Sequence, residues 1–169
     1  MFKYIVGLDM SLQSPGICIL NRELNFWNLY AFAQRKKTEI GFNKKIAHNA
    51  HLTLFPCIPE ATIHSDAFRY KFIVDHISKI IPNDKNMFVM MEAYAFVNNC
   101  AGSNYKLHEL GGVLKVELLK KNITEIHQIV NSSWKKISVG KGNCSKNETV
   151  ESVKISEPFI DLMKILKAF

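Results

Sequence analysis

The sequence contains no run of 18 or more apolar residues, which is the length that a helix needs to cross a bilayer. We therefore expect no membrane-spanning helix, and residues 1–4 do not have the form of a signal peptide. Its four cysteines are far apart and form no CxxC pair: Cys18, Cys57, Cys100 and Cys144. This spacing argues against a zinc site or a disulfide framework, and it favours a reducing, intracellular compartment.

Internal repeats and low-complexity segments are also missing, so we expect one domain, residues 1–169, with a sizeable core. Hydrophobic residues make up 47% of the chain and charged residues 22%, which is ordinary for a soluble globular protein. The formal net charge is +7. Such an excess of positive charge favours a polyanionic partner.

The chain is organised around residues 4–20, which predict a strand, a tight turn and a second strand. Apolar and partly β-branched residues fill the first strand, and Gln-Ser-Pro-Gly at 13–16 is typical of a turn. Asp9 stands at the end of the first strand. A carboxylate in an apolar strand is costly unless it is paired or binds a metal. Asp9 therefore either caps the turn, through Ser11 or later amides, or has a functional role.

The rest of the chain alternates between the periodicities of strands and helices. Polar or proline-containing stretches separate these segments, and residues 40–62 indicate a long loop or insertion. The predicted order is a strand at 25–32, a helix at 66–81 capped by Ser65, a strand at 87–91 followed by Glu92, a helix at 104–121, a strand at 123–130, a short helix from 131, a basic glycine-rich loop at 139–146, and a helical pattern from 147.

Three antiparallel strands followed by parallel strands and helices define an α/β domain with a mixed sheet. The ribonuclease H-like fold has this order, and we expect a mixed five-stranded sheet flanked by helices. In such a sheet the first strand lies centrally, beside the strand that ends at Glu92. The carboxylates of Asp9 and Glu92 would then meet at one edge.

Two carboxylates a few ångströms apart repel each other, so either one is protonated or a cation lies between them. Hard oxygen ligands without His or Cys indicate Mg²⁺, with Mn²⁺ as a substitute. Two such ions could activate a water and stabilise the leaving oxygen in phosphodiester cleavage. His48 and His51 could bind a metal on a helix, but no third ligand has suitable spacing.

Four motifs resemble, in this order along the chain, those of RuvC-like Holliday junction resolvases, especially the phage and viral forms. The resemblance runs from about residue 4 to residue 151. The motifs are Gly7-Leu8-Asp9-Met10-Ser11, Met91-Glu92-Ala93-Tyr94-Ala95-Phe96, His108-Glu109-Leu110-Gly111-Gly112-Val113-Leu114-Lys115, and Trp134-Lys135-Lys136 followed by Gly140-Lys141-Gly142-Asn143-Cys144-Ser145-Lys146.

The resemblance implies a homodimeric, Mg²⁺-dependent endonuclease that cleaves four-way DNA junctions in DNA recombination. It also implies a viral or phage protein that acts inside the host cell. Asp9 matches the first acidic residue of the family and Glu92 the second, so both are expected metal ligands. Lys135, or less closely Lys136, and Lys146 match two active-site lysines.

The resemblance also indicates where DNA is bound. Tyr94 and Phe96 match the region that family members press against the junction. Lys136 and Lys141 are expected to bind DNA phosphates, and glycines 140 and 142 would allow close approach. The same loop can also be interpreted as a solvated turn, and it lacks the spacing of a phosphate-binding Walker A loop.

One departure from the family pattern concerns the end of the site. The family has an acidic pair on a final helix, and the acids available here are Glu148, Glu151, Glu157 and Asp161. We choose Asp161 as the third catalytic and metal-binding carboxylate, because it lies in the last helical segment. Either Asp161 substitutes for the pair, or the chain lacks the C-terminal end of that helix.

Two other functions fit parts of the sequence. Actin-like and sugar-kinase ATPases also begin with strand, Asp, turn and strand, but they need a second domain and a second phosphate loop. A catalytically inactive DNA-binding or dimerisation module of the same fold stays open, because the final acidic motif is missing. The helix at 104–121 is a candidate dimer interface through Leu107, Leu110 and Leu114, unless these leucines pack on their own sheet.

Overall fold

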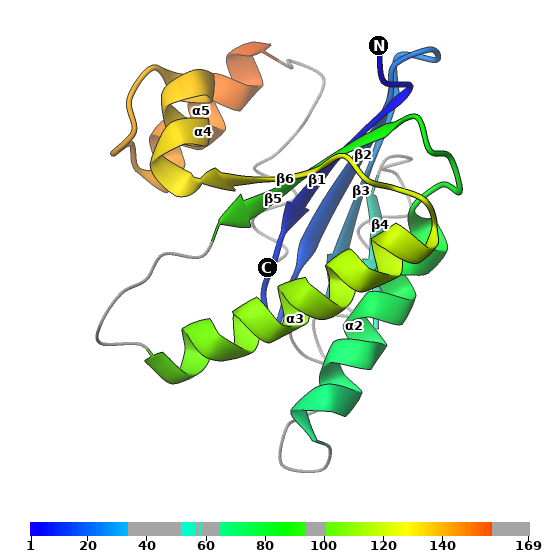
Figure 1. Ribbon diagram of the computed structural model, residues 1–169. Helices are drawn as coiled ribbons and strands as arrows, with labels where there is room; N and C mark the ends of the chain where they lie inside the picture. The colour runs from blue at the N-terminus through cyan, green and yellow to red at the C-terminus, as the bar shows by residue number, and fades with distance from the viewer. Residues whose placement is uncertain (34–51, 57, 59–64, 94–100, 157–169) are drawn as a thin grey trace. The chain divides into compact units, whose positions relative to one another are not determined.

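The computed structural model describes residues 1–33, 52–56, 58, 65–93 and 101–156 of the chain. It forms two compact units, Met1–Gln128 and Ile129–Phe169, each of which is described by itself. The elements are β1 (Tyr4–Asp9), β2 (Gly16–Asn21), β3 (Phe26–Phe32), β4 (Leu52–Phe55), α2 (Asp66–Ile80), β5 (Met87–Ala93), α3 (Ala101–Lys120), β6 (Ile126–Val130), α4 (Asn131–Val139) and α5 (Lys146–Ser156) (Figure 1).

The described strands form one mixed sheet in the order β4-β3-β2-β1-β5-β6. β1 pairs antiparallel with β2, and β2 pairs antiparallel with β3, as consecutive strands joined by short turns do. β1 pairs in parallel with β5. The predicted α/β fold with a central first strand is therefore confirmed.

The predicted long loop or insertion over residues 40–62 contains a strand, β4, which gives the described sheet six strands rather than the expected five. β4 pairs in parallel with β3, from Leu29 opposite Leu52 to Phe32 opposite Phe55. The Phe55 ring lies 4.9 Å from the Phe32 ring and stacks on Tyr30 at 5.9 Å. A four-residue run gives almost no periodicity, so only these tertiary partners identify it as a strand.

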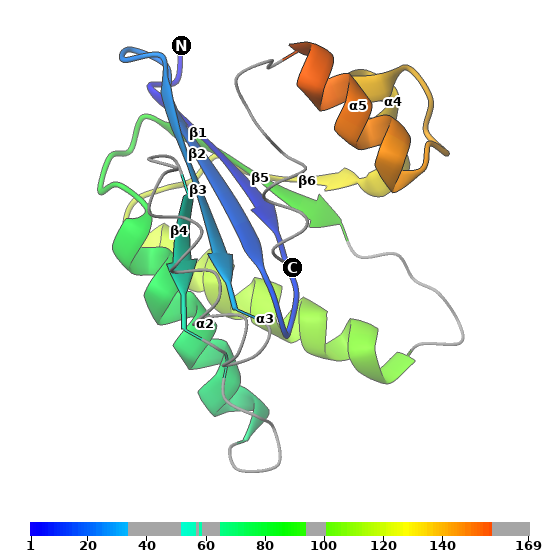
Figure 2. The same cartoon turned by 180° about the vertical axis from the view of Figure 1, so that it is seen from behind.

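Helices α2 and α3 cover one face of the sheet. They lie in front of it in Figure 1 and behind it in Figure 2. Fully buried side chains from both layers form the core, including Val6, Val89, Ile73 and Leu114. The side-chain hydroxyl of Ser65 accepts from the Phe68 amide at 3.3 Å, which confirms the predicted N-cap of α2.

The orientation of α3 corrects the candidate dimer interface. Leu110, Leu114 and Leu118 are completely buried in the core of their own unit, and Leu107 is half-buried. The interface through Leu110 and Leu114 is therefore wrong. Gly112 is exposed, and a Cβ added there would meet nothing within 4 Å.

None of the described helices is both long enough and apolar enough to traverse a bilayer.

Candidate functional site

The strand register brings Asp9 and Glu92 to the same level of the sheet. β1 and β5 pair in parallel with Leu8 opposite Met91, and Asp9 and Glu92 are the next residue on each strand. Glu92 lies one residue before the end of β5 rather than just beyond the strand. The strand register therefore places Asp9 and Glu92 next to each other on neighbouring strands, as predicted.

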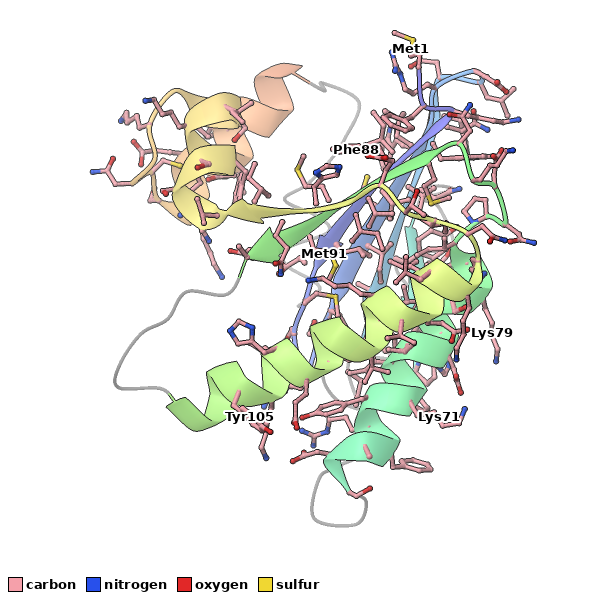
Figure 3. The ribbon with its side chains drawn as sticks, viewed as in Figure 1. Met1, Lys71, Lys79, Phe88, Met91 and Tyr105 are labelled. Atoms are coloured by element: carbon pink, nitrogen blue, oxygen red, sulfur yellow. The ribbon has the colours of Figure 1, made fainter. Side chains whose placement is uncertain are left out.

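Both carboxylates belong to the sheet face opposite α2 and α3. Leu8 and Met91 are buried against the helices, with exposed fractions of 3% and 0%. Side chains alternate along a strand, so the next residues on β1 and β5 point to the other face. Phe88 shares that face and Met91 does not; both are labelled on β5 in Figure 3. Asp9 is exposed and Glu92 half-exposed, so both can reach a ligand on this face.

The turn after Asp9 is held by a hydroxyl. Ser11 Oγ accepts from the amides of Gln13 and Ser14, both at 3.2 Å. Gly16 pairs with Asp9 across the hairpin, and a Cβ at Gly16 would lie 3.8 Å from the Asp9 Cβ. The Ser11 hydroxyl thus satisfies these two turn amides, and a side chain at position 16 would be in ordinary van der Waals contact with Asp9.

Two hard oxygen donors on one exposed sheet face fit a divalent cation such as Mg²⁺. Asp9 and Glu92 supply these donors, and neither lies on the helix-covered side of the sheet. In the described part of the chain, no group of three or more His, Cys, Asp and Glu side chains lies close enough to hold a metal ion. Asp161, the expected third ligand, lies outside the described residues.

The second unit carries the predicted lysines. Lys135, on α4, donates from Nζ to the carbonyl oxygen of Cys144 at 3.0 Å, and its ammonium lies 6.0 Å from the Trp134 ring. This bond ties α4 to the loop before α5. Lys136 and Lys146 are exposed. Lys146 is the first residue of α5, at the end of that helix where the dipole is positive.

The two glycines of the basic loop have structural roles. Gly140 caps the C-terminus of α4 with φ 86°, a conformation that favours glycine. A Cβ at Gly142 would lie only 3.0 Å from the carbonyl oxygen of Ser132. The two glycines that were predicted to let DNA approach are thus also needed for the end of α4 and for the packing of the loop against it.

Glu148 joins the N-terminus of α5 to this loop. Its Oε2 accepts from the Ser145 amide at 2.7 Å, and its own amide donates to Ser145 Oγ at 3.2 Å, which together form a capping box. Its Oε1 accepts from Lys141 Nζ at 2.6 Å. The hydrogen bond from Lys141, followed by that of the Ser145 amide, lowers the pKa of Glu148 to about 2.

Glu148 was one of the acids available for the third metal ligand, and its side chain is instead engaged in the cap. The Ser-x-x-Glu spacing at 145–148 is the sequence signal for this role. Lys141, expected to bind DNA phosphate, has the carboxylate of Glu148 as its partner.

Other candidate residues fall outside the described residues: Tyr94, Phe96, Glu157, His48 and His51. Glu151 lies on α5 and is exposed.

The central antiparallel hairpins, the parallel β1–β5 pair and the helices on one face define a ribonuclease H-like fold. Among solved structures, the chain is similar to RuvC of Thermus thermophilus, with a TM-score of 0.55 and 11% identity over 89% of this chain and 76% of that one. It is also similar to T. thermophilus RuvC in complex with Holliday junction substrate, with a TM-score of 0.59 and 12% identity over 94% of this chain and 82% of that one. No protein-family model matches the sequence, and no curated protein matches it.

Proposed function

We propose that this chain is a metal-dependent endonuclease that cleaves four-way DNA junctions. The observation that carries the proposal is the register of β1 and β5, which sets Asp9 and Glu92 side by side after the pair Leu8–Met91. The RuvC-like fold and the solved complex of T. thermophilus RuvC with Holliday junction substrate support the choice of DNA substrate.

The residues would divide the chemistry as follows. Asp9 and Glu92 would hold Mg²⁺, or Mn²⁺ in its place, with Asp161 as a third carboxylate. When bound, the metal would supply the Lewis acidity that activates a water for phosphodiester hydrolysis. Lys146, exposed at the positive end of α5, would stabilise charge on the scissile phosphate. Lys135, which bonds the Cys144 carbonyl, would position this loop.

DNA binding would use positive charge outside the reacting centre. Lys136 and Lys141 would contact phosphates, and Tyr94 and Phe96 would press against the branch point. A four-way junction presents two symmetric strands for cleavage, so a homodimer with one site per subunit matches it. We further propose that the chain comes from a phage or virus and acts inside the host cell.

The test is single-turnover cleavage of a synthetic four-way junction in Mg²⁺. Asp9→Asn and Glu92→Gln should each slow cleavage by about 10²-fold or more, because each removes a charge that holds the metal. Junction affinity should stay within about twofold of the wild-type value, because the carboxylates would bind metal rather than phosphate.

Glu23→Gln is the matched control, since Glu23 lies in the β2–β3 turn and forms its ion pair with Lys3. This variant should cleave at the wild-type rate. Near wild-type cleavage by Asp9→Asn or Glu92→Gln would contradict the metal assignment. If wild-type protein binds junctions but never nicks them in Mg²⁺ or Mn²⁺, the chain is instead the inactive DNA-binding module.

A further inference from the structure

Two aromatic rings are stacked on the sheet face that carries Asp9 and Glu92. Phe88 on β5 and His127 on β6 lie with their ring centroids 4.7 Å apart and their planes 18° from parallel. Phe88, labelled in Figure 3, lies four residues before Glu92, so both point to the same face. Ile126 packs against the core, so His127, the next residue, points away from it. The aromatic pair and the carboxylate pair therefore share one face.

The stacked rings are accessible to a ligand. The described helices of the unit Met1–Gln128, α2 and α3, cover the opposite face of the sheet (Figure 1 and Figure 2). The His127 side chain is 51% exposed, and Phe88 is half-buried. Aromatic side chains on neighbouring strands of an open sheet are a known arrangement for binding nucleobases, because every base has a π face that can stack on them.

Each ring is held in place by a neighbouring side chain. The Phe2 ring lies 5.5 Å from the Phe88 ring, and Glu125 Oε2 lies 3.2 Å from His127 Nε2. Rings that are already fixed lose little freedom when a ligand stacks on them. The carboxylate of Glu125 also repels a phosphate, so the uncharged base is the part of a nucleotide that fits here.

The distance from the rings to the carboxylates corresponds to a short stretch of DNA. Phe88 and Glu92 are four residues apart on β5, which is about 13 Å along the strand. A stacked DNA strand advances about 3.4 Å per nucleotide, so this distance spans about four nucleotides. A DNA strand with a phosphate at Asp9 and Glu92 would therefore reach the rings with a base about four nucleotides away.

From these observations we infer that Phe88 and His127 form a stacking platform for an unpaired base of the DNA strand bound at Asp9 and Glu92. The inference deepens the proposed function and rests on it for the choice of DNA as the ligand. Its test measures binding and contact rather than cleavage, so the platform and the nuclease activity can fail separately.

The first measurement is the dissociation constant of the full chain for a synthetic four-way junction, without divalent metal so that no strand is cut. His127→Leu should raise this constant about 5- to 150-fold, because one base loses its stacking partner. His127→Tyr should stay within about threefold of the wild-type value, because tyrosine restores an aromatic ring. Circular dichroism verifies that each variant is folded.

Phe26→Leu is the matched control for the loss of an exposed aromatic ring. Phe26 is 42% exposed at the beginning of β3, on the same face as the buried Phe32 and thus on the face opposite the platform. This variant should bind the junction as tightly as the wild-type protein does.

The second measurement locates the base by photo-cross-linking with 5-iodouracil, which reacts with aromatic side chains that stack on it. The label is moved one nucleotide at a time along a junction strand, and mass spectrometry identifies the cross-linked peptide. We expect cross-links to Phe88 or His127 from one or two adjacent positions, about four nucleotides from the phosphate that is cut. His127→Leu should reduce them.

The possible failures are distinct. Unchanged junction affinity in His127→Leu overturns the inference and leaves the proposed nuclease intact. Equal weakening by His127→Leu and His127→Tyr also overturns it, because stacking would then not be the cause. Cross-links to other peptides alone would show that something other than DNA covers this face. A wild-type chain that binds no DNA overturns the platform and the proposed function together.

Discussion

At the scale of single residues, Glu148 has two structural roles, one in a helix cap and one in an ion pair. It closes the capping box with Ser145 and neutralises Lys141 at the tip of the basic loop. A DNA phosphate that binds Lys141 would have to replace this carboxylate. The loop therefore presents less free positive charge than its lysines suggest.

The lowered pKa of Glu148 predicts how α5 responds to acid. Because the folded pKa of about 2 lies below the ordinary value of 4.5, the charged carboxylate stabilises the folded state at pH values above 4.5. This contribution is lost as the pH falls from about 5 to 2. We expect the difference in melting temperature between wild-type protein and Glu148→Gln to shrink over that interval.

The glutamine variant suits this comparison because glutamine can also close a capping box but carries no charge. Carboxyl NMR titration of Glu148 should give a midpoint near 2, and Lys141→Ala should move it upward, since Lys141 is the largest cause of the shift. A midpoint that does not change in Lys141→Ala would show that the ion pair is not formed in solution.

Lys141 and Lys146 should separate phosphate binding from chemistry. Lys146→Ala should lower the single-turnover rate of bound junction by about 10²-fold, because it removes a cation that stabilises the transition state. Lys141→Ala should instead weaken binding and reduce the slope of log affinity against log salt by about one. If both variants cleave at the full rate once the junction DNA is saturated with protein, Lys146 has no catalytic role.

At the scale of elements, the buried side of α3 should contribute far more to stability than an exposed turn does. Leu114→Ala should lower the free energy of unfolding by about 2–5 kcal/mol, because Leu114 is completely buried between helix and sheet. Leu24→Ala, at an exposed turn position, should change it by less than about 0.5 kcal/mol. Urea unfolding of both variants measures this, and a similar loss for both would contradict the orientation of α3.

Elements with one clear periodicity could be predicted from the sequence. The strand before Asp9, the cap at Ser65 and the strand that carries Glu92 all have local signals, and the structure contains them. The sequence left open whether Leu110 and Leu114 pack on the sheet or form a dimer interface, because apolar residues occur on both sides of α3. β4 could not be predicted either, because four residues gain their burial only from β3 and α2.

The candidate site shows the same division. The chain order predicted that Asp9 and Glu92 lie on neighbouring strands, and the register agrees. The sequence did not reveal that Glu148 is the partner of Lys141. The two residues are seven positions apart, so their contact depends on how the loop between them folds back. Gly142 illustrates the reason: its close approach to Ser132 sets the shape of the loop, and no pattern of residue types states that distance.

At the scale of the whole molecule, the similarity to T. thermophilus RuvC holds at only 11–12% identity. At so low an identity the similarity shows the fold alone, because many combinations of apolar residues of similar total volume can fill one core. Conclusions about activity must therefore come from individual side chains, above all the two carboxylates, rather than from the fold.

The central position of β1 also affects how the chain is made. Val6 pairs with Val89, so one edge of the first strand has no native partner until 83 further residues have been synthesised. At the usual rate of 5–20 residues per second, this unpaired backbone edge would wait about 4–17 s, while the hairpins with β2 and β3 can close at once. The nascent chain should therefore depend on chaperones during this interval, and its folding should be limited by the arrival of β5.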